Sequence, residues 1–239
     1  APGGFPDLER LARVAERGLF DFVLVGGGRG PEPVTVLDAL AAVTAHIGLA
    51  ATVDAAVADP FELVRRLATL DGLSAGRAGW HVGSGAAACV DTVREVWEAD
   101  FTVPPSPQGQ PVVIVAGDSE EEREFAAAHA DVLLTRYGPV EAGRSVCADL
   151  RRRLARYGRE PDAVRVLADV GGGFGGVAAE LDAHVGQGAA DGFLVRAGGL
   201  EEFVERVVPS LQERGAFRTE YQGATLRSHL GLGALVGKG

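Results

Sequence analysis

The sequence predicts an α/β fold, a shortened (β/α)8 barrel of the TIM type, and three observations support this class. Short apolar runs alternate with amphipathic helical stretches along the chain. The runs are almost continuously apolar, which is typical of parallel strands buried on both faces. The alternation continues through seven units without a sign of reversal. This favours a barrel over the alternative, an open doubly wound sheet.

The chain begins with a helical pattern, whereas an eightfold barrel begins with a strand. Either the first strand is missing from this sequence or the barrel is incomplete. The length suits one barrel domain over residues 1–239. Seven apolar runs are predicted strands, and they span residues 20–25, 47–53, 77–82, 112–116, 131–135, 164–168 and 191–195.

Eight helical patterns flank these runs, at residues 6–17, 33–45, 59–71, 86–98, 119–129, 139–157, 177–187 and 200–214. Asp59 and Ser119 are predicted N-terminal caps, because their side chains accept hydrogen bonds from free amides of the first turn. Pro60 fits that first turn. Glycines follow four predicted helix ends, where a left-handed cap favours this residue: Gly18, Gly158, Gly188 and Gly215.

Composition excludes several classes of function. The net charge of -10 argues against a nucleic-acid partner, which would need a basic face. No run of about 18 apolar residues predicts a membrane span, and residues 1–4 lack a signal-peptide pattern, so we expect a cytoplasmic protein. Cys89 and Cys147 are predicted reduced thiols, and no metal-ligand spacing appears in the sequence. The oligomeric state stays open, with a homo-oligomer among the alternatives.

Several blocks, in order along the chain, resemble one known family. Three of them are ERGLFDF at 16–22, ATLDGLSAGRAGW at 68–80 and TLRSHLGL at 225–232. Together the blocks cover nearly the whole chain and closely resemble the bacterial luciferase-like flavin monooxygenases. The nearest branch holds nitrilotriacetate, dibenzothiophene-sulfone and long-chain alkane monooxygenases. The resemblance implies a barrel, FMN as cosubstrate, O2-dependent oxidation of a small organic molecule, and a flavin reductase that supplies reduced FMN.

The chain also departs from that branch, whose members are longer. Between Val82 and Ala86, and between Trp97 and Pro107, the relatives carry insertions that build the roof of the pocket. Both intervals are short here. We therefore expect a more open mouth, unless the chain is part of a longer one.

In a parallel barrel, chemistry lies in the loops that follow the strand carboxyl ends. Gly26 and Gly27 follow the first run and would let a flat cofactor ring approach the backbone closely. His81 stands where the resemblance implies an Asn that contacts the flavin ring, and histidine can also move a proton near neutral pH. We predict that Gly26, Gly27 and His81 bind the cofactor and that His81 and Asp54 are catalytic.

The segment 116–119 matches the phosphate loop that the resemblance implies, so Gly117 and Ser119 are also predicted cofactor contacts. Backbone amides and the positive end of a helix attract phosphate there. Asp118 and the run Glu120-Glu121-Glu122 would compete with that phosphate or repel it. FMN binding would then need a compensating arginine, for which Arg123 and Arg136 are the candidates.

Two further residues are predicted to contact the substrate. Arg196 ends the last apolar run and could bind an anion in bidentate fashion, or pair with a carboxylate such as Glu201. Tyr137 follows the run at 131–135.

Three hypotheses about function follow. The chain is a reduced-flavin monooxygenase, a flavin-free relative that does acid–base chemistry on a metabolite, or a non-catalytic binding subunit of the same fold.

Overall fold

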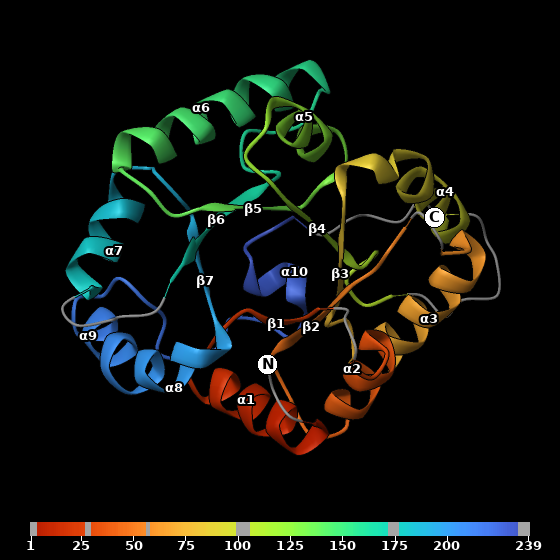
Figure 1. Cartoon of the computed structure of the whole chain (residues 1–239), viewed down its shortest axis with the longest axis horizontal. Helices are drawn as coiled ribbons and strands as arrows, with labels where there is room; N and C mark the ends of the chain where they lie inside the picture. Colours follow the sequence, from red (N-terminus) through yellow and green to blue (C-terminus); the bar gives the residue numbers. More distant parts are fainter. Residues whose placement is uncertain (1–3, 27–29, 56–57, 99–105, 172–176, 234–239) are drawn as a thin grey trace.

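The computed structural model describes residues 4–26, 30–55, 58–98, 106–171 and 177–233. Seven strands form one parallel sheet in which they follow one another in sequence order (Figure 1). Their bounds are Phe22–Val25 (β1), Gly48–Thr52 (β2), Ala78–Val82 (β3), Val112–Ala116 (β4), Val132–Arg136 (β5), Arg165–Val170 (β6) and Gly192–Val195 (β7). All seven predicted strands are confirmed, to within two residues at each end.

Helices surround the sheet on its outer side (Figure 1). They are Phe5–Arg17 (α1), Pro33–Ala41 (α2), Pro60–Leu73 (α3), Ala87–Glu98 (α4), Glu120–His129 (α5), Val140–Arg156 (α6) and Ala178–Gly186 (α7). The predicted helix at 200–214 is divided into Leu200–Glu202 (α8), a π-helical turn Phe203–Val207 (η3) and Val208–Glu213 (α9). Pro209 lies just after this turn, and because proline has no N–H it cannot make the regular helical bond. The short helix Leu226–His229 (α10) was not predicted.

The predicted fold class is confirmed, because the sheet curls into a barrel with helices outside it (Figure 1). An open doubly wound sheet would reverse its strand order, whereas here β1 to β7 are sequential. The described strands make no ladder between β7 and β1, so the barrel is open at this edge.

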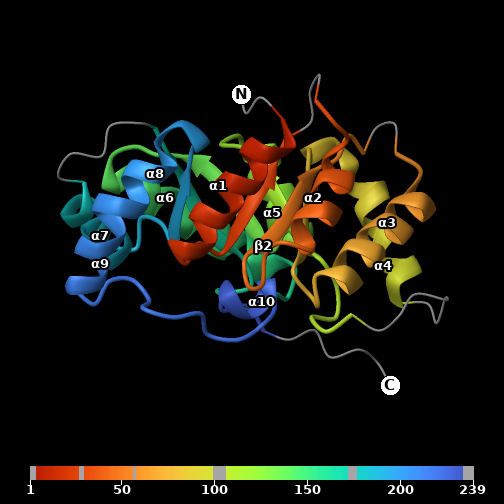
Figure 2. The ribbon, with the colours of Figure 1, turned by 90° about the horizontal axis from the view of Figure 1, so that it is seen from below.

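Alternation along the strands divides the apolar residues between two sides. Phe22, Ala50 and Ile114 face the interior and pack with Leu226 and Leu230 of the C-terminal segment. Helix α10 lies at one end of the ring of strands, and the start of α1 lies at the other (Figure 2). The neighbouring residues on each strand pack outward against the helices.

Helix α10 closes the amino end of the barrel. A Cβ placed on Gly48, the first residue of β2, would lie 2.6 Å from Leu226 Cδ1. A Cβ on Gly79 near the start of β3 would lie 3.1 Å from Leu226 Cδ2. These two glycines therefore make room for the plug, and the mouth at the carboxyl ends of the strands is the end available to a ligand.

The predicted helix ends are confirmed with one exception. Gly158, Gly188 and Gly215 have positive φ, but Gly18 has φ -79° and the left-handed residue is Leu19. Gly18 is needed for a different reason, since a Cβ there would lie 2.5 Å from Val204 Cγ2 of η3.

Asp59 caps α3 and Ser119 caps α5, as predicted. Both cysteines are buried and free. None of the described helices is both long and apolar enough to cross a membrane.

Candidate active site at the barrel mouth

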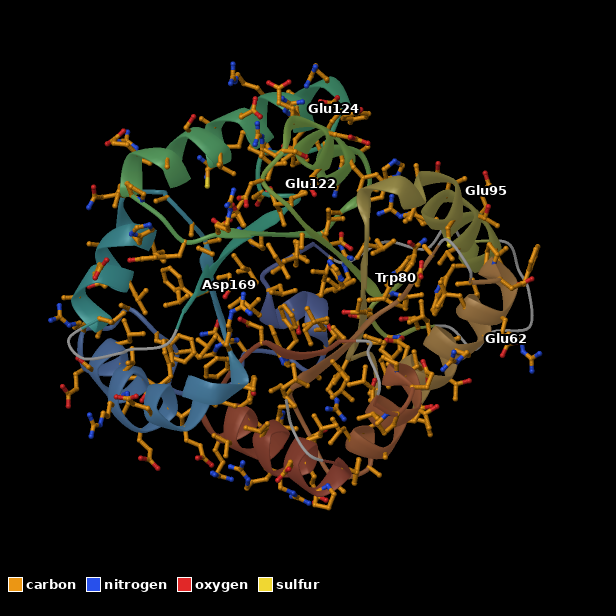
Figure 3. The ribbon with its side chains drawn as sticks, in the orientation of Figure 1. Glu62, Trp80, Glu95, Glu122, Glu124 and Asp169 are labelled. Carbon is orange, nitrogen blue, oxygen red and sulfur yellow. The ribbon has the colours of Figure 1, made fainter. Side chains whose placement is uncertain are left out.

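His81 faces the interior of the barrel near the carboxyl end of β3. Its strand neighbours Trp80 and Val82 pack outward among the helices, so the alternating side chain points inward (Figure 3 shows Trp80 outside β3). The His81 Nδ1 atom is buried and has no hydrogen-bond partner among the described residues. Burial lowers the pKa of His81 below its usual value, so the imidazole is neutral at pH 7. A neutral ring carries one donor and one acceptor.

Opposite charges alternate over β4 to β7 on the other half of the mouth. Asp118 follows β4, and its Oδ2 accepts from Arg136 Nε at 2.7 Å. The Cα of Arg136 pairs with that of Asp169 across the β5–β6 ladder. Asp169 in turn accepts from Arg196 Nε at 3.2 Å, and it lies on the inner side of β6 (Figure 3). Arg196 therefore pairs with a carboxylate, as one of the two alternatives expected, but its partner is Asp169 and not Glu201, which is bound to Arg10 of α1.

The start of α5 already holds a carboxylate. The Ser119 amide donates to Glu122 Oε2 at 2.9 Å, and the Glu122 amide donates to Ser119 Oγ at 3.1 Å. A Cβ on Gly117 would lie 2.0 Å from Glu122 Cδ, so this carboxylate lies directly over the glycine. The hydrogen bonds from Ser119, its backbone amide above all, hold the pKa of Glu122 below its usual value. Gly117 and Ser119 thus surround an anion that belongs to the chain.

The two arginines that could compensate a phosphate are engaged elsewhere. Arg123 donates from Nε to Asp149 Oδ2 of α6 at 2.7 Å, and its guanidinium also binds the Asp118 carbonyl. Arg136 pairs with the Asp118 carboxylate, which Thr135 also binds through its hydroxyl. Burial acts to raise the pKa of Asp118, but the hydrogen bonds from Thr135 and Arg136 outweigh it and lower that pKa.

The other half of the mouth is built from small residues. A Cβ on Gly26, after β1, or on Gly83, after β3, would meet no described atom within 4 Å. Gly27 lies outside the described residues. Asp54 is exposed just after β2. Neither glycine is therefore packed against the described residues, and the roles predicted for Gly26 and Asp54 stay predictions.

The Tyr137 side chain is directed away from the barrel mouth and packs against α7. Its hydroxyl donates to Glu180 Oε1 at 2.7 Å, and its ring stacks on His184 with 4.6 Å between centroids. Burial, and then the bond to Glu180, raise the pKa of Tyr137 to about 12. A substrate contact by Tyr137 stays a prediction. Glu180 was missed by the sequence reasoning because 43 residues separate it from Tyr137.

The described ranges contain no group of three His, Cys, Asp or Glu side chains that could hold a metal ion. The described residues of the mouth supply one neutral imidazole, two arginine–aspartate pairs and the glycines Gly26 and Gly83.

A family model described as luciferase-like monooxygenase matches residues 1–94 and 90–171, more than half of the sequence. The chain belongs to the luciferase-like monooxygenase family.

Two relatives extend the match to most of the chain. One component of the pristinamycin IIA synthase of Streptomyces pristinaespiralis is 29% identical over 372 aligned residues, which cover 93% of this chain and 88% of the relative. Dibenzothiophene-sulfone monooxygenase of Rhodococcus erythropolis is 25% identical over 403 residues, which cover 94% and 89%. Both alignments exceed the 239 residues of the chain, so these relatives contain segments that it lacks.

A solved structure supports the fold. EDTA monooxygenase EmoA from Chelativorans sp. BNC1 superposes with a TM-score of 0.85 at 20% sequence identity, over 96% of this chain and 92% of the other. At this identity the likeness shows the barrel fold alone.

Proposed function

We propose that the barrel mouth binds the ring of a flavin and that the chain oxidises a small organic molecule with O2. The observation that carries this proposal is the inward-facing imidazole of His81, neutral and with one buried nitrogen that lacks a partner among the described residues. The polar edge of a flavin ring offers both hydrogen-bond donors and acceptors, so it can satisfy that nitrogen in either tautomer. Gly26 carries no side chain, and a Cβ there would meet no described atom within 4 Å, which supports a close approach of the ring to the backbone.

The two ends of FMN fit this mouth differently. The ring end matches His81 and the glycine-lined side. The phosphate end does not match the start of α5, because Glu122 already accepts the amide that a phosphate would use. We therefore assign ring binding to the mouth and no phosphate binding to Gly117 and Ser119.

The part of the chain in the reaction is to bind the flavin ring, to orient the substrate and to accept a proton. A bound reduced flavin would supply two electrons, so that one oxygen atom of O2 enters the substrate and the other leaves as water. His81 would hold the ring edge and carry a proton at its free nitrogen. Arg196 is mostly exposed and would bind an anionic substrate group by exchanging Asp169 for it. A separate flavin reductase would supply the reduced cofactor.

A second candidate function is favoured by the filled start of α5. A barrel of this family that binds no flavin would use His81 as an acid–base group and Arg196 as an anion contact. This candidate needs no cofactor phosphate, which agrees with the Glu122 carboxylate already accepting the Ser119 amide at the start of α5.

Ring binding can be tested with lumiflavin, a flavin that carries only a methyl group in place of the phosphorylated chain. We expect wild-type protein to bind it, and His81→Phe to weaken binding about tenfold, the cost of one hydrogen bond. His81→Asn should stay close to wild type, because an amide also donates and accepts. Fluorescence quenching, with oxidised and with photoreduced flavin, measures the dissociation constants.

The matched control is His46→Gln. His46 is exposed, stacks on Tyr221 and lies just before β2 at the amino end of the barrel. This variant should bind lumiflavin like the wild type. If the wild type binds no flavin in either redox state, the proposal is wrong and the flavin-free candidate replaces it.

A further inference from the structure

The start of α5 is an anion site whose anion comes from the same helix. Phosphate binding at a helix start relies on free backbone amides and on the positive end of the helix dipole. Here the amide of Ser119 donates to the Glu122 carboxylate at 2.9 Å. Figure 3 shows Glu122 nearer to β4 and β5 than Glu124 is, as expected for a side chain that folds back over the loop.

The surroundings add negative charge at this place. Glu120 and Glu121 are exposed in the same turn, and Asp118 lies beside it. The guanidinium of Arg123 is directed to Asp149, and that of Arg136 to Asp118. A phosphate would have to displace Glu122 and then lie among three further carboxylates.

The geometry at Gly117 shows that the space where a phosphate would lie, next to the Ser119 amide, is also filled sterically. The ideal Cβ position of this glycine lies 2.0 Å from Glu122 Cδ and 2.1 Å from Glu122 Oε2. The carboxylate therefore occupies the space that a loop glycine would open to a ligand.

We propose that Glu122 is a built-in anion that takes the place of a cofactor phosphate, so that the mouth selects a flavin without a terminal phosphate. Riboflavin is the chemical class in question, and FMN is the ligand that is excluded. This inference rests on the proposed function for the ring, but its subject is a different residue and a different part of the ligand.

The test compares riboflavin and FMN by fluorescence titration of the same protein preparations. We expect the wild type to bind riboflavin at least about tenfold more tightly than FMN, because repulsion acts on the phosphate alone. Glu122→Gln keeps a side chain that can complete the cap but removes the charge. Glu122→Ala also opens the space over Gly117. Both variants should lower the preference for riboflavin, and Glu122→Ala should lower it more.

Glu121→Ala is the matched control, since it removes an exposed carboxylate of the same turn that does not occupy the space over Gly117. It should change the ratio of the two dissociation constants less than either Glu122 variant does. Inorganic phosphate provides a probe that is independent of flavin. At constant ionic strength it should raise the melting temperature of Glu122→Ala and leave that of the wild type unchanged.

The outcomes separate this inference from the function on which it rests. FMN bound as tightly as riboflavin by the wild type, or an unchanged ratio in both Glu122 variants, overturns the role of Glu122 and leaves ring binding intact. Equal stabilisation of wild type and Glu122→Ala by phosphate also overturns it. A wild type that binds lumiflavin, riboflavin and FMN equally poorly overturns the proposed function and the selection of flavins together.

Discussion

Arg227 and Asp131 form an ion pair between the C-terminal segment and the loop before β5. Each side chain is only 7% exposed. Arg227 donates to Asp131 Oδ1 at 3.2 Å, and Asp131 also accepts from the Val113 amide at 2.9 Å. A buried charge of this kind is tolerated only while its partner and hydrogen bonds are in place.

Replacing Arg227 with Met should therefore strongly destabilise the protein. It leaves the Asp131 carboxylate buried without its counter-charge, which costs about 3–5 kcal/mol. Urea unfolding followed by circular dichroism measures the change. Arg206→Met, which removes an exposed pair with Glu202 four residues earlier, should cost about 0.5 kcal/mol or less. Similar costs for the two variants would contradict the structural role of Arg227.

At the scale of residues, the sequence locates side chains better than it assigns their partners. His81 is placed at the mouth because it ends a buried strand, and this follows from periodicity alone. The acids at 118 and 120–122 are visible in the sequence as a conflict with phosphate. That Glu122 folds back over Gly117 depends on the turn geometry, and that Arg196 binds Asp169 depends on the β6–β7 register.

At the scale of elements, the strands are predictable because each is a compact apolar run, buried on both faces. The π turn η3 and helix α10 are not. Helix α10 has four residues, too few for a helical period, and is held by its contacts with the barrel interior. Gly18 follows the end of α1, as predicted, but a left-handed backbone conformation is not what requires glycine there. Close packing against Val204 requires it.

The contact at Gly18 gives a test of how α1 packs on η3. Gly18→Ala should cost about 1–3 kcal/mol, because its Cβ would overlap Val204 while the backbone angles suit alanine. Adding Val204→Ala should recover part of the loss. Gly72→Ala in α3 meets open space and should stabilise the protein by up to about 1 kcal/mol. Thermal unfolding of the wild type, the two single glycine variants and the double variant measures these changes. A Gly18→Ala variant as stable as the wild type would show that the packing of α1 on η3 shifts at no cost.

At the scale of the whole molecule, acid sensitivity follows from three buried or half-buried histidines. Burial is the main cause that lowers the pKa of His81, His129 and His229 in the folded protein. The unfolded chain then binds more protons just below about pH 6.5, so stability rises with pH in that window. Buried carboxyls such as Asp71 have raised pKa values and act in the opposite direction, starting from about pH 4.

We expect the free energy of unfolding to fall as the pH is lowered from 7 to 5. Each of the three histidines contributes a slope of less than about 1.4 kcal/mol per pH unit. Urea titrations at several pH values measure the slope, and His81→Asn should reduce it. A free energy of unfolding that stays constant or rises as the pH is lowered from 7 to 5 would contradict this prediction.

The plug formed by α10 has a consequence for the order of folding. Leu226 packs into the interior against Gly48 of β2 and Gly79 of β3, which lie 178 and 147 residues earlier in the chain. During synthesis the earlier strands can pair as they emerge. We expect water to reach the interior at the amino end of the barrel until the segment around Leu226 has left the ribosome and packed there. Contacts of such long sequence separation make folding slow. We therefore expect the nascent chain to exclude water from the barrel interior only after the α10 segment has been made.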